Sequence, residues 1–262
     1  MIYLQAGLKQ RTFIFAPSKI LKNYVKTNQL VLNIRSLSTR IRKKVFYLKY
    51  IQIFLQLREF IYLKKNKEIL IATSNNGKIK EFENLLTEYK VVSLKDYDIE
   101  DAIEDGTSFL ENALIKAKHG SIKTGLYSIA DDSGLVVPKL NNQPGIYSAR
   151  YAGNKASDKD NRDKIIEELN KLSVKELSAY YVCCLVGIEA YDDPMPLISF
   201  GRIYGKVSIL SSGDGGFGYD KIFYPDNFDC SMASIDSSIK NKISHRAIAV
   251  KDFMNKFNKL IF

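Results

Sequence analysis

The sequence has few of the residues that most often build metal or nucleophilic sites. Its 262 residues include two histidines and three cysteines. Cys183, Cys184 and Cys230 form no C-x-x-C pair and no even-numbered set, which excludes a disulfide framework and argues against a zinc site. Thiols used as small core residues are typical of a reducing compartment, so we expect a cytoplasmic protein.

The sequence also has no long apolar run, and the first quarter of the chain has almost no acidic residues. No run of about 18 or more apolar residues predicts a membrane-spanning helix, and no secretory signal pattern is present. Residues 1–67 hold 15 Lys and Arg but one acid, Glu59, whereas the remainder holds 24 basic and 28 acidic residues. The net charge of +10 therefore belongs to the N-terminal segment, and the mildly acidic remainder does not predict nucleic-acid binding.

Residues 1–66 form a basic N-terminal extension, which we separate from a domain over residues 67–262. Between residues 42 and 63, polar side chains recur at the spacing of an amphipathic helix: Lys49, Gln52, Gln56 and Glu59. Such a helix is compatible with contact to a membrane surface. An organelle transit sequence and translated sequence upstream of the true start are the alternatives.

From Glu68 onward, the pattern predicts an α/β domain. We expect strands over 68–72, 89–94, 127–130, 135–140, 179–190 and 197–207, and helices over 78–86, 108–119, 158–172 and near the C-terminus. Strands that first alternate with helices, followed by two long consecutive strands, indicate a mixed sheet rather than a parallel one.

Two adjacent carboxylates stand in the middle of this domain, in the stretch Ala130-Asp-Asp-Ser-Gly134. One interpretation is a turn between two strands, because these residue types favour turns. The other is a Mg²⁺ site, because hard cations take carboxylate oxygens. Neighbouring side chains of an extended segment point to opposite faces, so only Asp131 or Asp132 would face a given cleft.

Three further motifs suit a nucleotide. Thr73-Ser-Asn-Asn-Gly-Lys78 is a strand–turn–helix of the kind that binds phosphate, although Ala72 and Ile79 exclude a Walker A loop. Gly213, Gly215 and Gly218 match G-x-G-x-x-G, but an extended segment follows where a dinucleotide fingerprint needs a helix. That loop instead offers aromatic rings to a base. Ser244-His-Arg246 offers hydrogen-bond donors at a helix start.

In their order along the chain, these motifs resemble the inosine/xanthosine triphosphate pyrophosphatase family. The resemblance rests on Thr73-x-Asn-x-x-Lys78, Phe109-x-Glu-Asn-Ala113, Ala130-Asp-Asp-Ser-Gly134, Pro144-Gly-Ile-Tyr-Ser-Ala-Arg150, Gly215-Gly-Phe-Gly-Tyr-Asp220 and Ser244-His-Arg246. It covers the chain from about Ile69 and excludes residues 1–66. It implies Mg²⁺-dependent hydrolysis of ITP, dITP and XTP to the monophosphate and pyrophosphate, in a homodimer. The implied fold is an elongated mixed sheet with flanking helices and two lobes around a nucleotide cleft.

The resemblance also implies a role for individual residues. Asp132 would be the general base and a metal ligand, with Glu104 as the second metal ligand. The remaining expected contacts are with substrate: Thr73, Ser74, Asn75, Asn76, Gly77 and Lys78 for the triphosphate, Ser133 beside it, Phe217 stacked on the purine, Gly218, Tyr219 and Asp220 around it, Lys240 for phosphate, and His245 with Arg246 for the base.

The sequence departs from the family pattern at two places. Lys221 replaces a usual proline, and Ser238 with Ile239 precedes Lys240 where acids are common, which leaves the register of Lys240 open. Two alternative functions remain at this stage. One is a nucleotide hydrolase of broader specificity, and the other is a nucleotide-binding module tethered to a membrane or nucleic acid by the basic segment.

Overall fold

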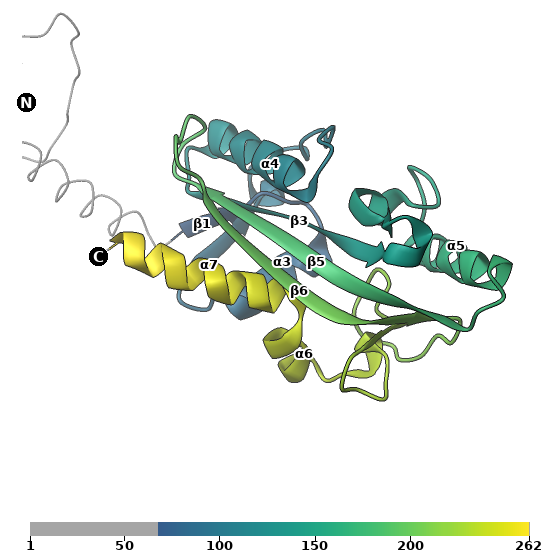
Figure 1. Cartoon of the computed structure of the whole chain (residues 1–262). Coiled ribbons are helices and arrows are strands. Elements are labelled where there is room, and N and C mark those ends of the chain that lie inside the picture. The colour runs from purple at the N-terminus through teal and green to yellow at the C-terminus, as the bar shows by residue number, and fades with distance from the viewer. Residues whose placement is uncertain (1–67, 262) are drawn as a thin grey trace, which may run out of the picture. The chain divides into compact units, whose positions relative to one another are not determined.

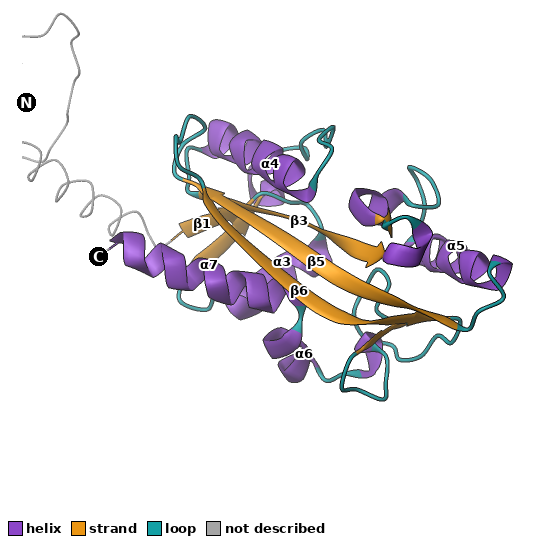
Figure 2. Cartoon of the chain, viewed as in Figure 1, coloured by secondary structure: helices purple, strands orange, loops and turns teal. Residues whose placement is uncertain are grey.

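The computed structural model describes residues 68–261, which form a mixed sheet with helices on both faces (Figures 1 and 2). The predicted helix within residues 1–66 lies outside the described residues. The strands are β1 (Glu68–Ile71), β2 (Lys90–Ser93), β3 (Ser128–Val137), β4 (Gln143–Pro144), β5 (Glu176–Ile188), β6 (Leu197–Ser208) and β7 (Phe223–Pro225). The helices are α3 (Asn76–Leu85), α4 (Phe109–Thr124), α5 (Asp158–Lys171), α6 (Ser237–Ile243) and α7 (His245–Ile261).

The sheet is parallel at one side and antiparallel at the other, which confirms the predicted fold class. Its strand order is β2-β1-β3-β5-β6-β7, with β4 paired to β3. The strands β2, β1 and β3 run parallel, whereas β5, β6 and β7 each run antiparallel to their neighbour. The parallel part arises from β-helix-β connections through α3 and α4, and the antiparallel part from the β5–β6 hairpin.

Two helical layers cover different parts of one sheet face. Side chains from α3 and α7 pack with Ile71, Ile129 and Leu185 in one apolar cluster. Leu135 and Tyr181 lie farther along the same strands, where the cluster around them contains α5. Figure 1 shows α7 and α5 at opposite ends of the β5–β6 hairpin. The other sheet face packs against α4. A cleft forms beside β3, and residues from both faces of the sheet line it.

The stretch Ala130–Gly134 differs from the prediction of two strands flanking a turn. It lies inside the single strand β3, and each of its residues pairs with β5. Pairing along β5 outweighs the local turn preference of Asp, Ser and Gly. Gly134 is required by a close approach, because a Cβ there would lie 2.4 Å from Ser148 Oγ. The turn interpretation is therefore wrong.

Other predicted boundaries shift by a few residues. Helix α3 begins two residues before the predicted start, because the Asn75 side chain caps it, and α4 extends to Thr124 before Gly125 ends it in a left-handed conformation. The sequence did not predict α6 as a separate helix. Among residues 68–261, no helix is long and apolar enough to cross a membrane.

Candidate active site

A cleft of about 390 Å³ opens beside the middle of β3, where this strand is paired on one side only. Strand β1 pairs with β3 only at Ser128 and Ile129, and β4 pairs with it only at Val136 and Val137. Between these pairs, no described strand adjoins the β3 edge that faces away from β5. Side chains from both faces of β3 can therefore reach the same opening, and Asp132 and Ser133 both line it.

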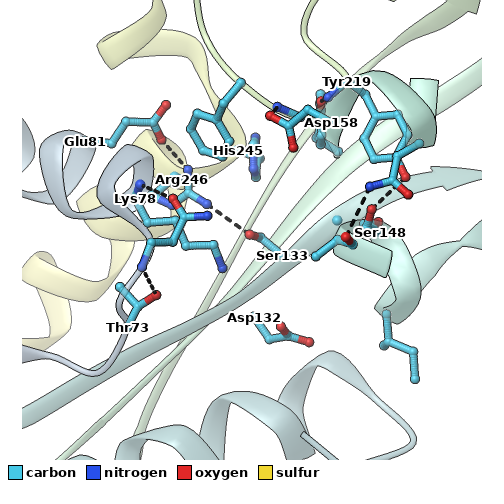
Figure 3. A pocket seen from close by; sticks show the side chains of 18 of the residues that line it. Thr73, Lys78, Glu81, Asp132, Ser133, Ser148, Asp158, Tyr219, His245 and Arg246 are labelled. Atoms are coloured by element: carbon cyan, nitrogen blue, oxygen red, sulfur yellow. Dashed lines mark hydrogen bonds and ion pairs between the residues drawn. The ribbon is translucent and has the colours of Figure 1, made fainter. Parts of the chain in front are cut away.

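The two aspartates point to opposite faces of the sheet, as the strand geometry predicts. Asp131 lies on the face covered by α3 and α7, and Asp132 lies on the face covered by α4. Figure 3 shows Ser133 directed toward Arg246 and Asp132 directed to the other side of the strand. Asp132 lines the cleft, whereas Asp131 is buried and does not line it.

Asp131 is bound by two cations. Lys78 Nζ lies 3.0 Å from Asp131 Oδ1, and Arg246 donates from Nη2 to Oδ2 at 2.9 Å. Burial alone would raise the pKa of Asp131, but Lys78 and Arg246 outweigh it and hold that pKa well below its usual range. Asp131 is therefore a fixed negative charge that orients two cations from α3 and α7.

Asp132 pairs with a different cation, Lys116, which also pairs with Glu104. Lys116 of α4 donates from Nζ to Asp132 Oδ1 at 2.9 Å and to Glu104 Oε1 at 3.1 Å, and Asn112 Nδ2 lies 3.3 Å from the second oxygen of Asp132. Burial raises the pKa of Asp132, and Lys116 offsets only part of that rise. A carboxylate with a raised pKa in the lining of a cleft is suited to accept a proton.

Glu81 joins the two C-terminal helices to α3. Its carboxylate pairs with Lys240 Nζ at 2.9 Å and with Arg246 Nη1, and Lys240 also contacts Asp220 Oδ2 at 2.8 Å. Burial opposes ionisation of Glu81, but Arg246 and Lys240 lower its pKa. Lys240 also lines the cleft, and its contact with phosphate stays a prediction.

An aromatic ring faces these cations. The Phe217 ring centre lies 5.2 Å from Lys240 Nζ and 5.9 Å from the Arg246 guanidinium carbon. Gly77 lies against the same ring, because a Cβ at residue 77 would be 2.9 Å from a Phe217 carbon. Gly77, in the first turn of α3, thus makes room for the ring instead of lining the cleft.

His245 lies deep in the cleft as a neutral ring. It stacks on Tyr181 with ring centres 4.7 Å apart and 7° between the planes. Burial and the neighbouring Arg246 lower its pKa to about 3. Its Nδ1 is buried without a hydrogen-bond partner in the structure. A buried nitrogen in this state is suited to recognise a polar group of a ligand.

Several polar groups of the turn that was predicted to bind phosphate are hydrogen-bonded within the protein instead. Backbone N–H groups of Ser74 and Asn75 donate to Asp101 and to Thr73 Oγ1, so these two do not point at a ligand. Asn76 does not line the cleft, and its side chain accepts from Lys95 Nζ at 2.6 Å. The acidic loop before α4 therefore satisfies part of this turn, and Lys78 supplies its positive charge.

The structure brings most of the predicted site residues to one cleft. The lining includes Thr73, Ser74, Asn75, Lys78, Glu104, Asp132, Ser133, Phe217, Gly218, Tyr219, Asp220, Lys240, His245 and Arg246, but neither Asn76 nor Gly77. Sequence reasoning missed Glu81, Asp101, Lys116, Asp158 and Tyr181, which also line it. Helical spacing gave a usable signal for two of them: Glu81 follows Lys78 by three residues, and Lys116 follows Asn112 by four.

Comparison with known proteins places the chain in a family. The family model described as "Ham1 family" matches residues 69–256. The chain belongs to the Ham1 family. A relative from Legionella pneumophila (strain Paris), named dITP/XTP pyrophosphatase, is 48% identical over 184 residues, which are 70% of this chain and 95% of the relative. A Haemophilus influenzae protein of the same name is 42% identical over 192 residues, or 72% of this chain and 98% of the relative.

Solved Ham1 structures share the fold. The Coxiella burnetii HAM1 protein is 37% identical, has a TM-score of 0.68, and matches over 73% of this chain and 98% of its own. The Staphylococcus aureus Ham1 protein is 35% identical with a TM-score of 0.64, over 74% of this chain and 99% of its own. The resemblance inferred from the six motifs is thereby confirmed.

Proposed function

We propose that this chain hydrolyses deaminated purine nucleoside triphosphates, namely ITP, dITP and XTP, to the monophosphate and pyrophosphate. The observation that carries the proposal is the division of the cleft into two chemically different ends. One end holds Asp132, Glu104 and Lys116, and the other holds the Phe217 ring and the neutral His245. The names of the Legionella and Haemophilus relatives agree with this proposal.

The charged end suits a triphosphate and a magnesium ion. Among residues 68–261, no three His, Cys, Asp or Glu side chains converge on one point. The candidate oxygen donors are instead a pair of carboxylates, those of Glu104 and Asp132, which both contact Lys116. Two carboxylates fit Mg²⁺, which takes its other ligands from phosphate and water. In the structure, the Lys116 ammonium bridges these carboxylates, so a cation is already favoured between them. Bound Mg²⁺ would neutralise phosphate charge during hydrolysis.

The protein's own groups would carry the remaining steps. Asp132 orients the attacking water and takes its proton, as its raised pKa favours. Lys78 and Lys240 line the cleft and would attract the phosphate chain. Lys116, once released from its two carboxylates, would contribute a third positive charge to the phosphates. These charges stabilise the transition state by lying where negative charge develops.

The other end would recognise the base. Phe217 would stack on the purine ring, and His245 would offer a polar nitrogen to its edge. A 6-oxo group accepts a hydrogen bond that the 6-amino group of adenine cannot accept. A buried donor left unpaired discriminates by orders of magnitude, so ATP is expected to be a poor substrate.

A substrate panel tests the proposal. Pyrophosphate release is measured from ITP, XTP, dITP, ATP and GTP, with Mg²⁺ and with a chelator. We expect release from ITP, XTP and dITP in the presence of Mg²⁺, with ATP slower by at least roughly a hundredfold. Equal turnover of ATP would contradict the proposed specificity, and release of orthophosphate alone would contradict the proposed bond cleavage.

The family resemblance also supports a homodimer. The exposed aromatic side chains of β6, Phe200 and Tyr204, offer an apolar surface outside the cleft. Such surfaces are typical of subunit interfaces. Sedimentation equilibrium would give twice the chain mass for a dimer, and a single chain mass at micromolar concentration would exclude it.

A further inference from the structure

The loop that carries Phe217 is held from within by a hydrogen bond from the Phe217 N–H to Asp220 Oδ2 at 3.1 Å. Phe217 stands between Gly216 and Gly218, and the ring is only half-buried. Glycine neighbours add conformational freedom, so the orientation of the ring depends on what holds the loop backbone. The hydrogen bonds around residues 217–220 show which groups hold it.

Helix α5 holds both backbone groups of Gly218. Asp158 accepts a hydrogen bond from the Gly218 N–H at 2.7 Å, and Arg162 donates from Nη1 to the Gly218 carbonyl at 2.7 Å. Asp158 and Arg162 are four residues apart and therefore lie on one side of the helix. Both contacts involve a charged side chain, which makes such hydrogen bonds stronger than neutral ones.

The helix itself is firmly anchored. Ile165 and Leu169 of α5 are fully buried in the cluster that also contains Tyr219. The anchored helix can therefore define the position of the Gly218 peptide. Arg162 differs from Asp158 in one important respect, because Asp158 lines the cleft and Arg162 does not. The hydrogen bond that links Arg162 to the lining of the cleft is the one to Gly218.

We propose that Arg162 is a positioning residue that, together with Asp158, fixes the Gly218 peptide and so sets the Phe217 ring for stacking on the base. The proposal rests on the proposed function, because it assigns to α5 control over base affinity in that cleft. Loss of the Arg162 contact should weaken binding of the base while leaving the phosphate end, with Asp132 and Lys116, unchanged.

The kinetic test compares Arg162→Ala with Arg162→Lys and with Lys159→Ala. Lys159 is an exposed residue of the same helix whose ammonium pairs with Asp163, so it is a matched control. For Arg162→Ala we expect KM for ITP to rise about tenfold, as loss of one charge-assisted hydrogen bond implies, with kcat changed less than about twofold. Arg162→Lys should recover part of the affinity, and Lys159→Ala should match the wild type.

Inorganic tripolyphosphate, which has no base, serves as the matched ligand. Its inhibition constant should be the same for the wild type and Arg162→Ala, because the phosphate end is untouched. An unchanged KM for ITP would overturn the proposal. Equal weakening of ITP and tripolyphosphate would overturn it as well, because the effect would then not be specific to the base.

A second readout needs no catalysis. The chain has no tryptophan, so Phe217→Trp introduces a single indole at the ring position. In ligand-free protein, adding Arg162→Ala should lower the fluorescence anisotropy of this indole, whereas adding Lys159→Ala should not. Unchanged anisotropy with Arg162→Ala would overturn the proposal. If the wild type failed to hydrolyse ITP, the proposed function would fail, and the anisotropy would still report whether Arg162 holds the loop.

Discussion

Asp131 and Asp132 are neighbours on β3, but the two faces of the sheet give their carboxylates opposite surroundings. Asp131 is paired with both Lys78 and Arg246, which hold its pKa below the usual range despite burial. Asp132 shares Lys116 with Glu104, and burial keeps its pKa raised. The difference shows how one strand can place a structural charge and a proton acceptor in adjacent positions.

The largest expected effect is on turnover and concerns Asp132. Asp132→Asn keeps the size of the side chain but removes the proton acceptor. We expect kcat for ITP to fall on the order of 10³-fold, the typical contribution of general base catalysis. Equilibrium dialysis with ITP should still detect binding. Retained turnover would show that another group acts as the base.

The largest expected effect on stability concerns Asp131. Asp131→Asn leaves the buried Arg246 and the half-buried Lys78 without their shared carboxylate, which costs about 3 kcal/mol of unfolding free energy. Denaturant unfolding at neutral pH measures this loss. Asp252→Asn is the control, because its pair with Lys256 is exposed and such pairs contribute at most about 1 kcal/mol. Equal losses in the two variants would refute the structural role of Asp131.

The two aspartates should also give opposite signs in the pH dependence of stability. The folded pKa of Asp131 lies below its unfolded value, so its stabilising contribution is present above about pH 4 and is lost as the pH falls. The folded pKa of Asp132 lies above its unfolded value, so its contribution is present at low pH and is lost as the pH rises through the folded pKa. Unfolding free energies of the wild type and of each Asn variant, measured from pH 3 to pH 7, isolate the two contributions by difference.

A smaller effect is expected on the acidic limb of the pH–rate profile. Lys116 lowers the pKa of Asp132, so Lys116→Met should raise that pKa further and move the acidic limb of kcat to higher pH. Lys118→Met is the control, because Lys118 is exposed on the same helix. A limb that stays in place would mean that Lys116 does not tune the base.

The smallest expected effect concerns His245. Because burial and Arg246 lower its pKa to about 3, the ring stays neutral throughout the physiological range. Ionisation of His245 during turnover would give the pH–rate profile an inflection near pH 6.5 that is lost in His245→Asn. We expect no such inflection. Such an inflection would show that His245 titrates during turnover.

Much of this site was predictable because its motifs are local in sequence. The strand–turn–helix around Lys78 and the His245-Arg246 pair at the start of α7 could be read from neighbouring residues alone. The alternation of side chains along a strand predicted that only one of Asp131 and Asp132 would face the cleft, and the family resemblance implied that it is Asp132. The order of the motifs carried the resemblance to a known family, and that resemblance implied the role of Glu104.

The parts that sequence reasoning missed depend on contacts between distant segments. The residue types of Ala130–Gly134 favour a turn, but pairing with β5 makes this stretch part of a strand. Arg246 was expected to read the base, and the structure shows that its guanidinium also binds Asp131 and Glu81. Lys116 and Glu81 were missed because their partners lie on other elements. Helical spacing marks both as neighbours of motif residues, but it does not identify their ion-pair partners on other elements.

The most direct test of the account is a residue-resolved titration of the two carboxylates. The side-chain carboxyl carbons of ¹³C-labelled aspartates can be followed by NMR, with Asp131→Asn and Asp132→Asn used to assign their signals. We predict that Asp132 titrates above the ordinary aspartate value of about 3.9 and that Asp131 stays ionised to well below it. An Asp131 signal that titrates at or above the pH at which Asp132 titrates would contradict the assignment of one carboxylate to structure and the other to catalysis.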